Sequence, residues 1–272
     1  MVFLKPVILN SGETSPQTFD QPIDVALTLA MADLKAKFLN VEKGTVRYGA
    51  IRGSEEFSHY KELTKGLRSF DLRSLGSPSQ RLAFWINIYN TGVIHGVIEL
   101  GLLQSVKEFP RFFRRVSYEI GGHRFSLNDI EHGILRGNRR PPYGFLKPFR
   151  KHDPRLGFSI LPMDPRIHFA LVCGARSCPP IGFYEADQID FQLQLAAASF
   201  VNSPQVKILP REKTIFLSMI FKWYATDFGG TGAGIIDTLL NFMDEGEEKT
   251  FLQENKEQIR IRYQPYDWNL NE

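Results

Sequence analysis

The stretch RLAFWINIYNTGVIH, from Arg81 to His95, places apolar side chains on nearly every side of the helix that it predicts. It belongs to the longest helical pattern of the chain, which runs from Gln80 to Leu100 after the loop Leu75–Ser79. A surface helix has one apolar stripe, whereas a helix that is apolar all round is buried. The sequence therefore predicts a central helix that the rest of the fold surrounds.

Shorter patterns on both sides of this helix predict the remaining elements. Before it, helices are expected at 23–38 and 55–67; the first has an apolar face of Val25, Leu27, Leu29, Met31, Leu34 and Phe38. After it, Gly121-Gly122 predicts a tight turn between strands 116–120 and 123–125, followed by a short helix to Arg136 with Ser126 or Asn128 as its cap. The later elements are a helix at 184–201, a hairpin of strands 206–209 and 214–217, helices near 219–226 and 234–243, and a strand at 259–263.

These strands and helices segregate along the chain and do not alternate as strict βαβ units, which favours the α+β class. We expect a single compact domain in which the central buried helix packs on an antiparallel sheet. An N-terminal helical segment, 1–76, is expected to pack on a core domain, 77–272. The residues up to about Pro22 resemble an arm.

Composition excludes several classes of protein. The net charge of +3 comes from 33 basic and 30 acidic residues, a balance that argues against nucleic-acid binding. Two local basic groups, Arg111, Arg114 and Arg115 and then Arg136, Arg139 and Arg140, indicate a solvated face or a site for an anionic group. Two cysteines do not make a disulfide scaffold, and no apolar run is long enough to span a membrane. We expect a soluble cytoplasmic protein with reduced thiols.

The stretch from Ile167 to Pro180 is the first candidate for chemistry. Its apolar part, 167–173, predicts a buried strand, on which His168 and Cys173 point to opposite faces. Cys178 follows in a loop and precedes two prolines. A thiol beside an imidazole is a candidate nucleophile, so Cys178 is the better candidate and Cys173 is expected to be an inert core thiol.

Two other groups of polar residues lie in apolar surroundings. Glu131 and His132 are neighbours on the predicted short helix and are expected to point too far apart to orient each other; Glu131 either orients a catalytic imidazole or pairs with an arginine such as Arg136. Asn87 and Asn90 lie in the central helix, where buried amides need specific partners. Asn90 either donates to an oxyanion or ties the helix to a loop.

Two competing chemistries use the same residues. Zinc ligation by Cys173, Cys178, His168 and His132 is supported only weakly, because the Cys-x₄-Cys spacing is a poor zinc signal. A redox disulfide between the two cysteines lacks the CxxC spacing typical of that chemistry. We expect neither a metal nor a cofactor.

At these motifs the chain resembles the uncharacterised family catalogued as domain of unknown function 547. The blocks that carry the resemblance span about residues 80–271: Ala83–Asn90, Ile130–Arg136, Asp164–Leu171 running on to Ser177-Cys178-Pro179, Phe221–Tyr224 with Asp227-Phe228, and Tyr266–Asn271.

That family is similar to papain-like cysteine hydrolases in a permuted arrangement. The resemblance implies Cys178 as nucleophile, His168 as base and Glu131 as the residue that orients it, with His132 as the rival base. Asn90 is a further candidate for a substrate-binding or orienting role. It implies a cysteine peptidase or hydrolase that cleaves an amide or related acyl bond in a peptide or protein substrate. The alternative is a non-catalytic peptide-binding or scaffold module with the same fold.

Overall fold

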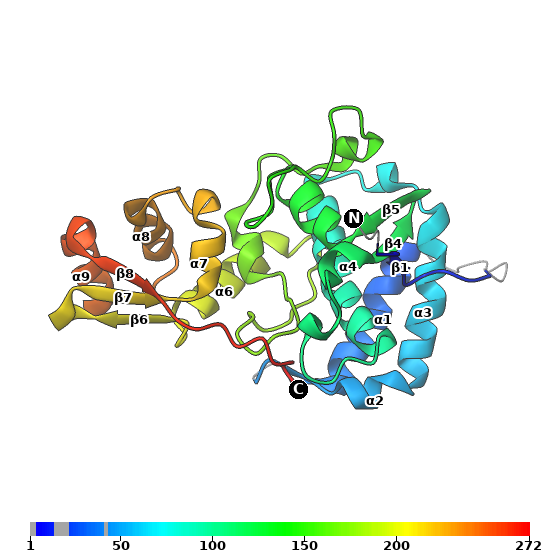
Figure 1. Cartoon of the computed structure of the whole chain (residues 1–272), viewed down its shortest axis with the longest axis horizontal. Helices are drawn as coiled ribbons and strands as arrows, with labels where there is room; N and C mark the ends of the chain where they lie inside the picture. Colours follow the sequence, from blue (N-terminus) through cyan, green and yellow to red (C-terminus); the bar gives the residue numbers. More distant parts are fainter. Residues whose placement is uncertain (1–3, 14–21, 41–42) are drawn as a thin grey trace. The chain divides into compact units, whose positions relative to one another are not determined.

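The computed structural model describes residues 4–13, 22–40 and 43–272 and has a mixed α+β fold. Contacts group the residues into two compact units (Figure 1). Unit 1 comprises Met1–Asp164, Leu171–Ile189 and Trp268–Glu272, and unit 2 comprises Pro165–Ala170 and Asp190–Asp267. The expected N-terminal segment 1–76 falls within unit 1 together with the first part of the expected core.

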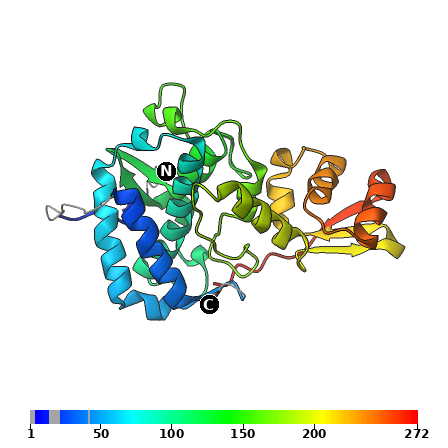
Figure 2. The same cartoon turned by 180° about the vertical axis from the view of Figure 1, so that it is seen from behind.

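Unit 1 is built around one long helix. Its helices are α1 (Ile23–Phe38), α2 (Tyr48–Arg52), α3 (Glu55–Gly66), α4 (Pro78–Glu99) and α5 (Phe112–Arg115), and its strands are β1 (Val7–Ile8), β2 (Leu39–Asn40), β3 (Thr45–Val46), β4 (Val116–Ile120) and β5 (His123–Ser126). Helices α1 and α3 lie side by side in both views (Figures 1 and 2). The helices predicted at 23–38 and 55–67 are thus confirmed to within one residue.

Helix α4 is the predicted central helix. It begins at a capping box, in which the Ser77 side chain accepts from the Gln80 amide and the Gln80 side chain accepts from the Ser77 amide. Every residue from Ala83 to Ile98 is buried. The helix can approach β4 closely because Gly92 and Gly96 have no side chain at the contact.

The sheet beside α4 has three strands in the order β1-β4-β5. Strands β4 and β5 form the predicted hairpin, and its two turn glycines have the positive φ angles, 56° and 74°, that a type I′ turn requires. Strand β1 pairs in parallel with β4. The arm expectation is therefore wrong for Val7–Ile8, while its residues 14–21 lie outside the described part of the chain.

Unit 2 contains a second three-stranded sheet, in the order β6-β7-β8. Its strands are β6 (Val206–Leu209), β7 (Thr214–Leu217) and β8 (Arg260–Tyr263), and its helices are α6 (Ile189–Val201, which begins at the boundary), α7 (Met219–Trp223), α8 (Gly232–Leu240) and α9 (Glu247–Asn255). The rings of Phe169, Phe200, Phe221 and Phe228 pack together in its core. The predicted hairpin and final strand are confirmed, and β8 pairs in parallel with β7.

Two local predictions are wrong, and a third holds in part. The stretch 167–173 is not a strand: a 3-10 helix, Pro165–Phe169, is followed by irregular chain. Residues 167–172 are buried, as predicted. The amide of Val172, however, donates to the side chain of Asn90 and not to a neighbouring strand. The predicted short helix after β5 is present, but as a π-helix, Asp129–Leu135. On α1, Val25 and Leu29 are 43% and 53% exposed and do not join the buried face, so this part of the predicted apolar face is wrong.

Candidate functional site

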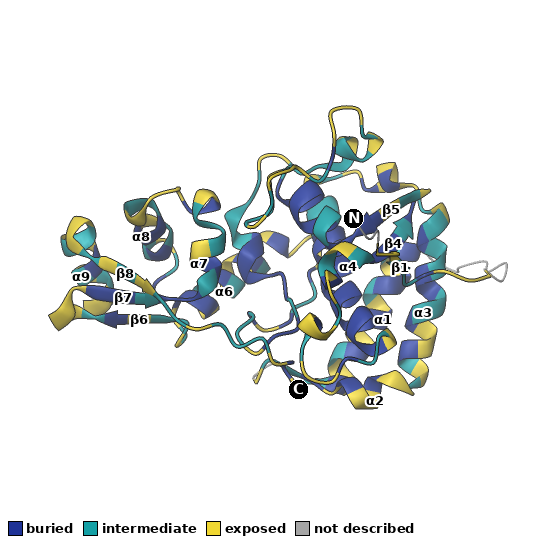
Figure 3. Ribbon diagram, viewed as in Figure 1, coloured by how far each residue is buried: buried dark blue, intermediate teal, exposed yellow. Residues whose placement is uncertain are grey.

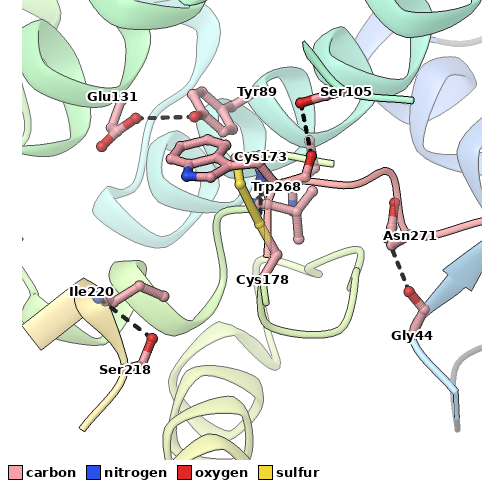
Figure 4. The surroundings of a disulfide bond; sticks show 12 residues. Gly44, Tyr89, Ser105, Glu131, Cys173, Cys178, Ser218, Ile220, Trp268 and Asn271 are labelled. Carbon is pink, nitrogen blue, oxygen red and sulfur yellow. Dashed lines mark hydrogen bonds between the residues drawn. A yellow bond between two sulfur atoms is a disulfide. The ribbon is translucent and has the colours of Figure 1, made fainter. Parts of the chain in front are cut away.

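The two cysteines lie in a loop of unit 1 and form a disulfide with each other (Figure 4). Their Cα atoms are 6.3 Å apart, which is within the usual range for such a bond. The loop turns back at Gly174, whose φ is +77°, and the Cys178 amide donates to the Ala175 carbonyl at 3.0 Å. The expectations of reduced thiols and of a core position for Cys173 are therefore wrong, since both cysteines are only partly buried and bonded.

One backbone group is directed at the candidate nucleophile. The amide of Cys173 donates a hydrogen bond to Sγ of Cys178 at 2.9 Å. Within the disulfide this sulfur accepts the hydrogen bond, and the bond ties Cys178 to the backbone at the start of the loop.

The C-terminal segment of the chain pairs with this cysteine loop. The Arg176 amide donates to the Asn269 carbonyl at 2.8 Å, and the Asn271 amide donates to the Gly174 carbonyl at 3.1 Å. Ala175 and Leu270 form an antiparallel bridge between these two hydrogen bonds. The four residues between the cysteines thus include the edge that holds the C-terminal segment.

Helix α4 holds the chain on both sides of the cysteine loop. The side-chain oxygen of Asn90 accepts from the Val172 amide at 3.1 Å, and its nitrogen donates to the Gly182 carbonyl at 3.2 Å. Asn87 exchanges two hydrogen bonds of 2.8 Å with the backbone of Tyr184. Of the two roles expected for Asn90, the structure shows the tie between helix and loop.

Glu131 and His132 lie on the π-helix, whose wider turn is stabilised by the hydrogen bonds Arg136 N to Glu131 O (2.8 Å) and Asn138 N to Gly133 O (3.0 Å). Ser126 caps this segment as predicted, by accepting from the Asp129 amide. The expected divergence of the two side chains is wrong, because Oε1 of Glu131 is 3.5 Å from Nδ1 of His132.

The partners of these two side chains define their roles. The Tyr89 hydroxyl donates to Oε2 of Glu131 at 3.0 Å (Figure 4). The Arg136 guanidinium lies 3.0 Å from Nδ1 of His132. Since arginine can only donate, Nδ1 accepts, and the proton of a neutral His132 ring is on Nε2. Tyr89 precedes Asn90 in α4, so one helix contacts both the carboxylate and the cysteine loop.

His168 belongs to unit 2, in which Asp227 is its carboxylate partner. Its Nε2 lies 2.9 Å from Oδ2 of Asp227, and both side chains are almost completely buried. The Tyr224 ring stacks on the imidazole with centroids 3.9 Å apart, and Phe228 contacts it edge-on. The contacts with Asp227, Tyr224 and Phe228 hold the imidazole of His168 in one orientation.

Sequence reasoning missed the pairing of His168 with Asp227. The signal was present, because Asp227-Phe228 was one of the matched family blocks and lies close to Tyr224 in the chain. His168 and Asp227 are 59 residues apart in the chain, so no local sequence pattern connects them. Cys178, Glu131, His132 and Asn90 belong to unit 1.

Metal binding finds no support within the part of the chain that the structure describes. No group of three or more His, Cys, Asp or Glu side chains there is arranged to hold an ion. The helices of the described residues also include none with the length and apolar character to cross a bilayer.

With the geometry established, comparison with known proteins adds one finding. Residues 72–201 match the model of a family described as "Protein of unknown function, DUF547". This DUF547 region includes α4, the π-helix and the cysteine loop, and it begins close to the expected core boundary at 77. No curated protein and no solved structure matches the chain.

Proposed function

We propose that the protein is a cysteine hydrolase that cleaves an amide or related acyl bond after reduction of its disulfide, with Cys178 as the nucleophile. The hydrogen bond from the Cys173 amide to Sγ of Cys178 is the observation that supports this role best. An external dithiol would reduce the Cys173–Cys178 bond, giving two protein thiols and an oxidised dithiol. Reduction thus precedes catalysis.

The chemical step needs a base that accepts the thiol proton and returns it to the leaving group. The thiolate of Cys178 attacks the carbonyl carbon, the amine or alcohol leaves with the proton, and water then hydrolyses the thioester. His168 is the base that the family resemblance implies. Its contact with Asp227 supports this role, because a carboxylate that accepts from one ring nitrogen keeps the other in the basic form.

Asp227 takes the orienting role in this proposal in place of Glu131. Glu131 accepts from Tyr89 and lies beside His132, which makes His132 the rival base. The Arg136 contact opposes this rival role, because a donated hydrogen bond occupies Nδ1.

Alkylation of the reduced protein by iodoacetamide tests the proposal, with Cys178 followed by peptide mass spectrometry and hydrolysis followed with p-nitrophenyl acetate. Cys173→Ala, which leaves Cys178 without a disulfide partner, should be alkylated quickly near neutral pH, below the range about pH 8.5 in which an ordinary thiol ionises. His168→Gln and Asp227→Asn should lower hydrolysis on the order of a hundredfold.

Matched variants decide between the bases. His132→Gln and Glu131→Gln should retain most of the activity if His168 is the base, and the reverse result would assign the role to His132. Cys178→Ala should abolish hydrolysis. If it hydrolyses the ester as fast as the unmodified protein, or if Cys178 of Cys173→Ala shows the pH profile of an ordinary thiol, the proposal is wrong.

The disulfide itself favours a second candidate, a non-catalytic peptide-binding or scaffold module. In that case the Cys173–Cys178 bond is a permanent brace of the loop that holds the C-terminal segment. Resistance of the disulfide to a large excess of dithiothreitol in the folded protein, together with absence of hydrolysis, would support this candidate.

A further inference from the structure

A surface loop of unit 1, residues 138–149, is closed at its base by one side chain. Oδ1 of Asn138 accepts from the Phe149 amide at 3.0 Å, and its Nδ2 donates to the Phe149 carbonyl at 3.1 Å. The Phe149 ring is buried against the π-helix at Gly133, where a Cβ would lie only 2.4 Å from Cε2 of the ring. Both ends of the 138–149 loop are therefore held firmly to the unit.

The outer part of the 138–149 loop presents large apolar side chains to solvent. Tyr143, Phe145 and Leu146 are 78%, 92% and 81% exposed, and the loop appears largely as exposed chain in Figure 3. Pro141, Pro142 and Pro148 restrict its backbone, and a turn is closed by the Gly144 amide donating to the Pro141 carbonyl at 2.9 Å. Such a preordered loop loses little conformational entropy when it binds.

The same segment is basic. Arg140, Lys147, Arg150 and Lys151 are all exposed, and the sequence from His132 to His152 contains no aspartate or glutamate. The next acid, Asp153, already contacts the Arg155 guanidinium at 2.7 and 2.9 Å. The exposed apolar side chains are thus flanked by positive charges that Asp153 does not offset.

We propose that the 138–149 loop docks the protein on the surface of an anionic lipid bilayer. Phe145 and Leu146 enter the boundary between headgroups and acyl chains, while Lys147, Arg150 and Lys151 attract the anionic headgroups. Charge complementarity favours an anionic partner, and the protruding apolar side chains favour a bilayer, which accepts them without a matching pocket. This inference is independent of the proposed hydrolase activity.

Co-sedimentation of the full chain with vesicles tests the proposal. One vesicle set is phosphatidylcholine alone, and the other contains about one third phosphatidylserine. The protein should sediment with the second set, and added salt should weaken the binding. Phe145→Ser/Leu146→Ser should lower the partition coefficient about tenfold or more. Lys147→Gln/Lys151→Gln should lower it about twenty-fivefold, since each basic residue near the surface contributes about fivefold.

Matched variants elsewhere on the surface serve as controls. Leu103→Ser/Phe191→Ser removes two other exposed apolar side chains, and Lys43→Gln/Lys207→Gln removes two other exposed charges. Both control variants should bind as the unmodified protein does. Absence of binding to the anionic vesicles, equal losses in loop and control variants, or binding to polyglutamate without binding to vesicles would each overturn the proposal.

Discussion

The histidine of α4 shows how burial alone can set the charge of a side chain. His95 is completely buried, and its Nδ1 lies 2.9 Å from the Tyr118 hydroxyl, which in turn is 2.9 Å from the Tyr60 hydroxyl. Burial and, to a smaller extent, the positive charge of Lys61 together lower the pKa of His95 to about 3. The Glu99 carboxylate lies 4.0 Å from Nε2 of His95, but the net shift of the His95 pKa is still downward. His95 is therefore neutral in the folded protein at neutral pH.

This predicts a loss of stability in acid. Between about pH 6.5 and pH 3 the unfolded chain binds a proton at His95 that the folded chain does not, so the free energy of unfolding falls as the pH is lowered through this range. At about pH 5 the contribution is about 2 kcal/mol. Urea unfolding near pH 7 and near pH 5 measures the difference in the free energy of unfolding between the two pH values. We expect this difference to be smaller in His95→Gln than in the unmodified protein, and to be unchanged in His59→Gln, which replaces an exposed histidine. Equal pH dependence of His95→Gln and the unmodified protein would contradict the prediction.

At the scale of elements, local signals predicted what local interactions determine. Helix α4 follows from its apolar residues and its capping box, and the β4–β5 hairpin follows from two glycines that accept positive φ. The sequence predicted the helix that ends near Arg136 but not its π form, and it predicted a strand where the 3-10 helix Pro165–Phe169 lies. Distant residues contact both segments: Phe149 packs at Gly133 in the first, and Asn90 accepts from Val172 just after the second.

The packing of α4 on β4 predicts an unusual response to alanine. A Cβ at Gly96 would lie 2.9 Å from Cγ1 of Val116, and one at Gly92 would lie 2.9 Å from Cδ2 of Leu127. Gly92→Ala and Gly96→Ala should each lower the free energy of unfolding by about 1–3 kcal/mol despite the higher helix propensity of alanine. Gly49 is an exposed position of α2 with open space around its Cα, so Gly49→Ala should be neutral or stabilising by up to about 1 kcal/mol. Thermal unfolding measures the stability of the three variants. If Gly96→Ala is more stable than the unmodified protein, the prediction is wrong and α4 can move away from the sheet.

At the scale of the whole molecule, the residue types of the candidate site were predictable but their pairing was not. Cys178, Glu131 and His132 were recognised from residue type and sequence context, and Asn90 from its polar side chain in an apolar helix. The disulfide, the Glu131 contact with Tyr89 and the His168 contact with Asp227 depend on how distant segments meet. Such contacts have no periodicity along a single sequence.

Asn271 shows how strongly unit 1 depends on one such distant contact. The Tyr48 hydroxyl donates to its Oδ1 at 2.8 Å, and its Nδ2 donates to the Gly44 carbonyl at 2.9 Å. Burial raises the pKa of Tyr48 above its usual range, so this hydroxyl remains a donor. The backbone of Asn271 also accepts from Val46 and donates to Gly174. One residue thus joins the segment 44–48 to the cysteine loop.

Asn271→Ala should therefore loosen both segments together. The substitution leaves the buried Tyr48 hydroxyl and the Gly44 carbonyl without these partners, at a cost of about 2–4 kcal/mol. Hydrogen exchange should accelerate at the amides of Val46 and Arg176, because both donate to the C-terminal segment. Gln104→Ala is the matched control, since Gln104 contacts Leu270 through its backbone carbonyl, which alanine retains. If Val46 and Arg176 exchange equally slowly in both variants, the segment is held by its backbone pairing alone, and the side chain of Asn271 does not couple the cysteine loop to the 44–48 segment.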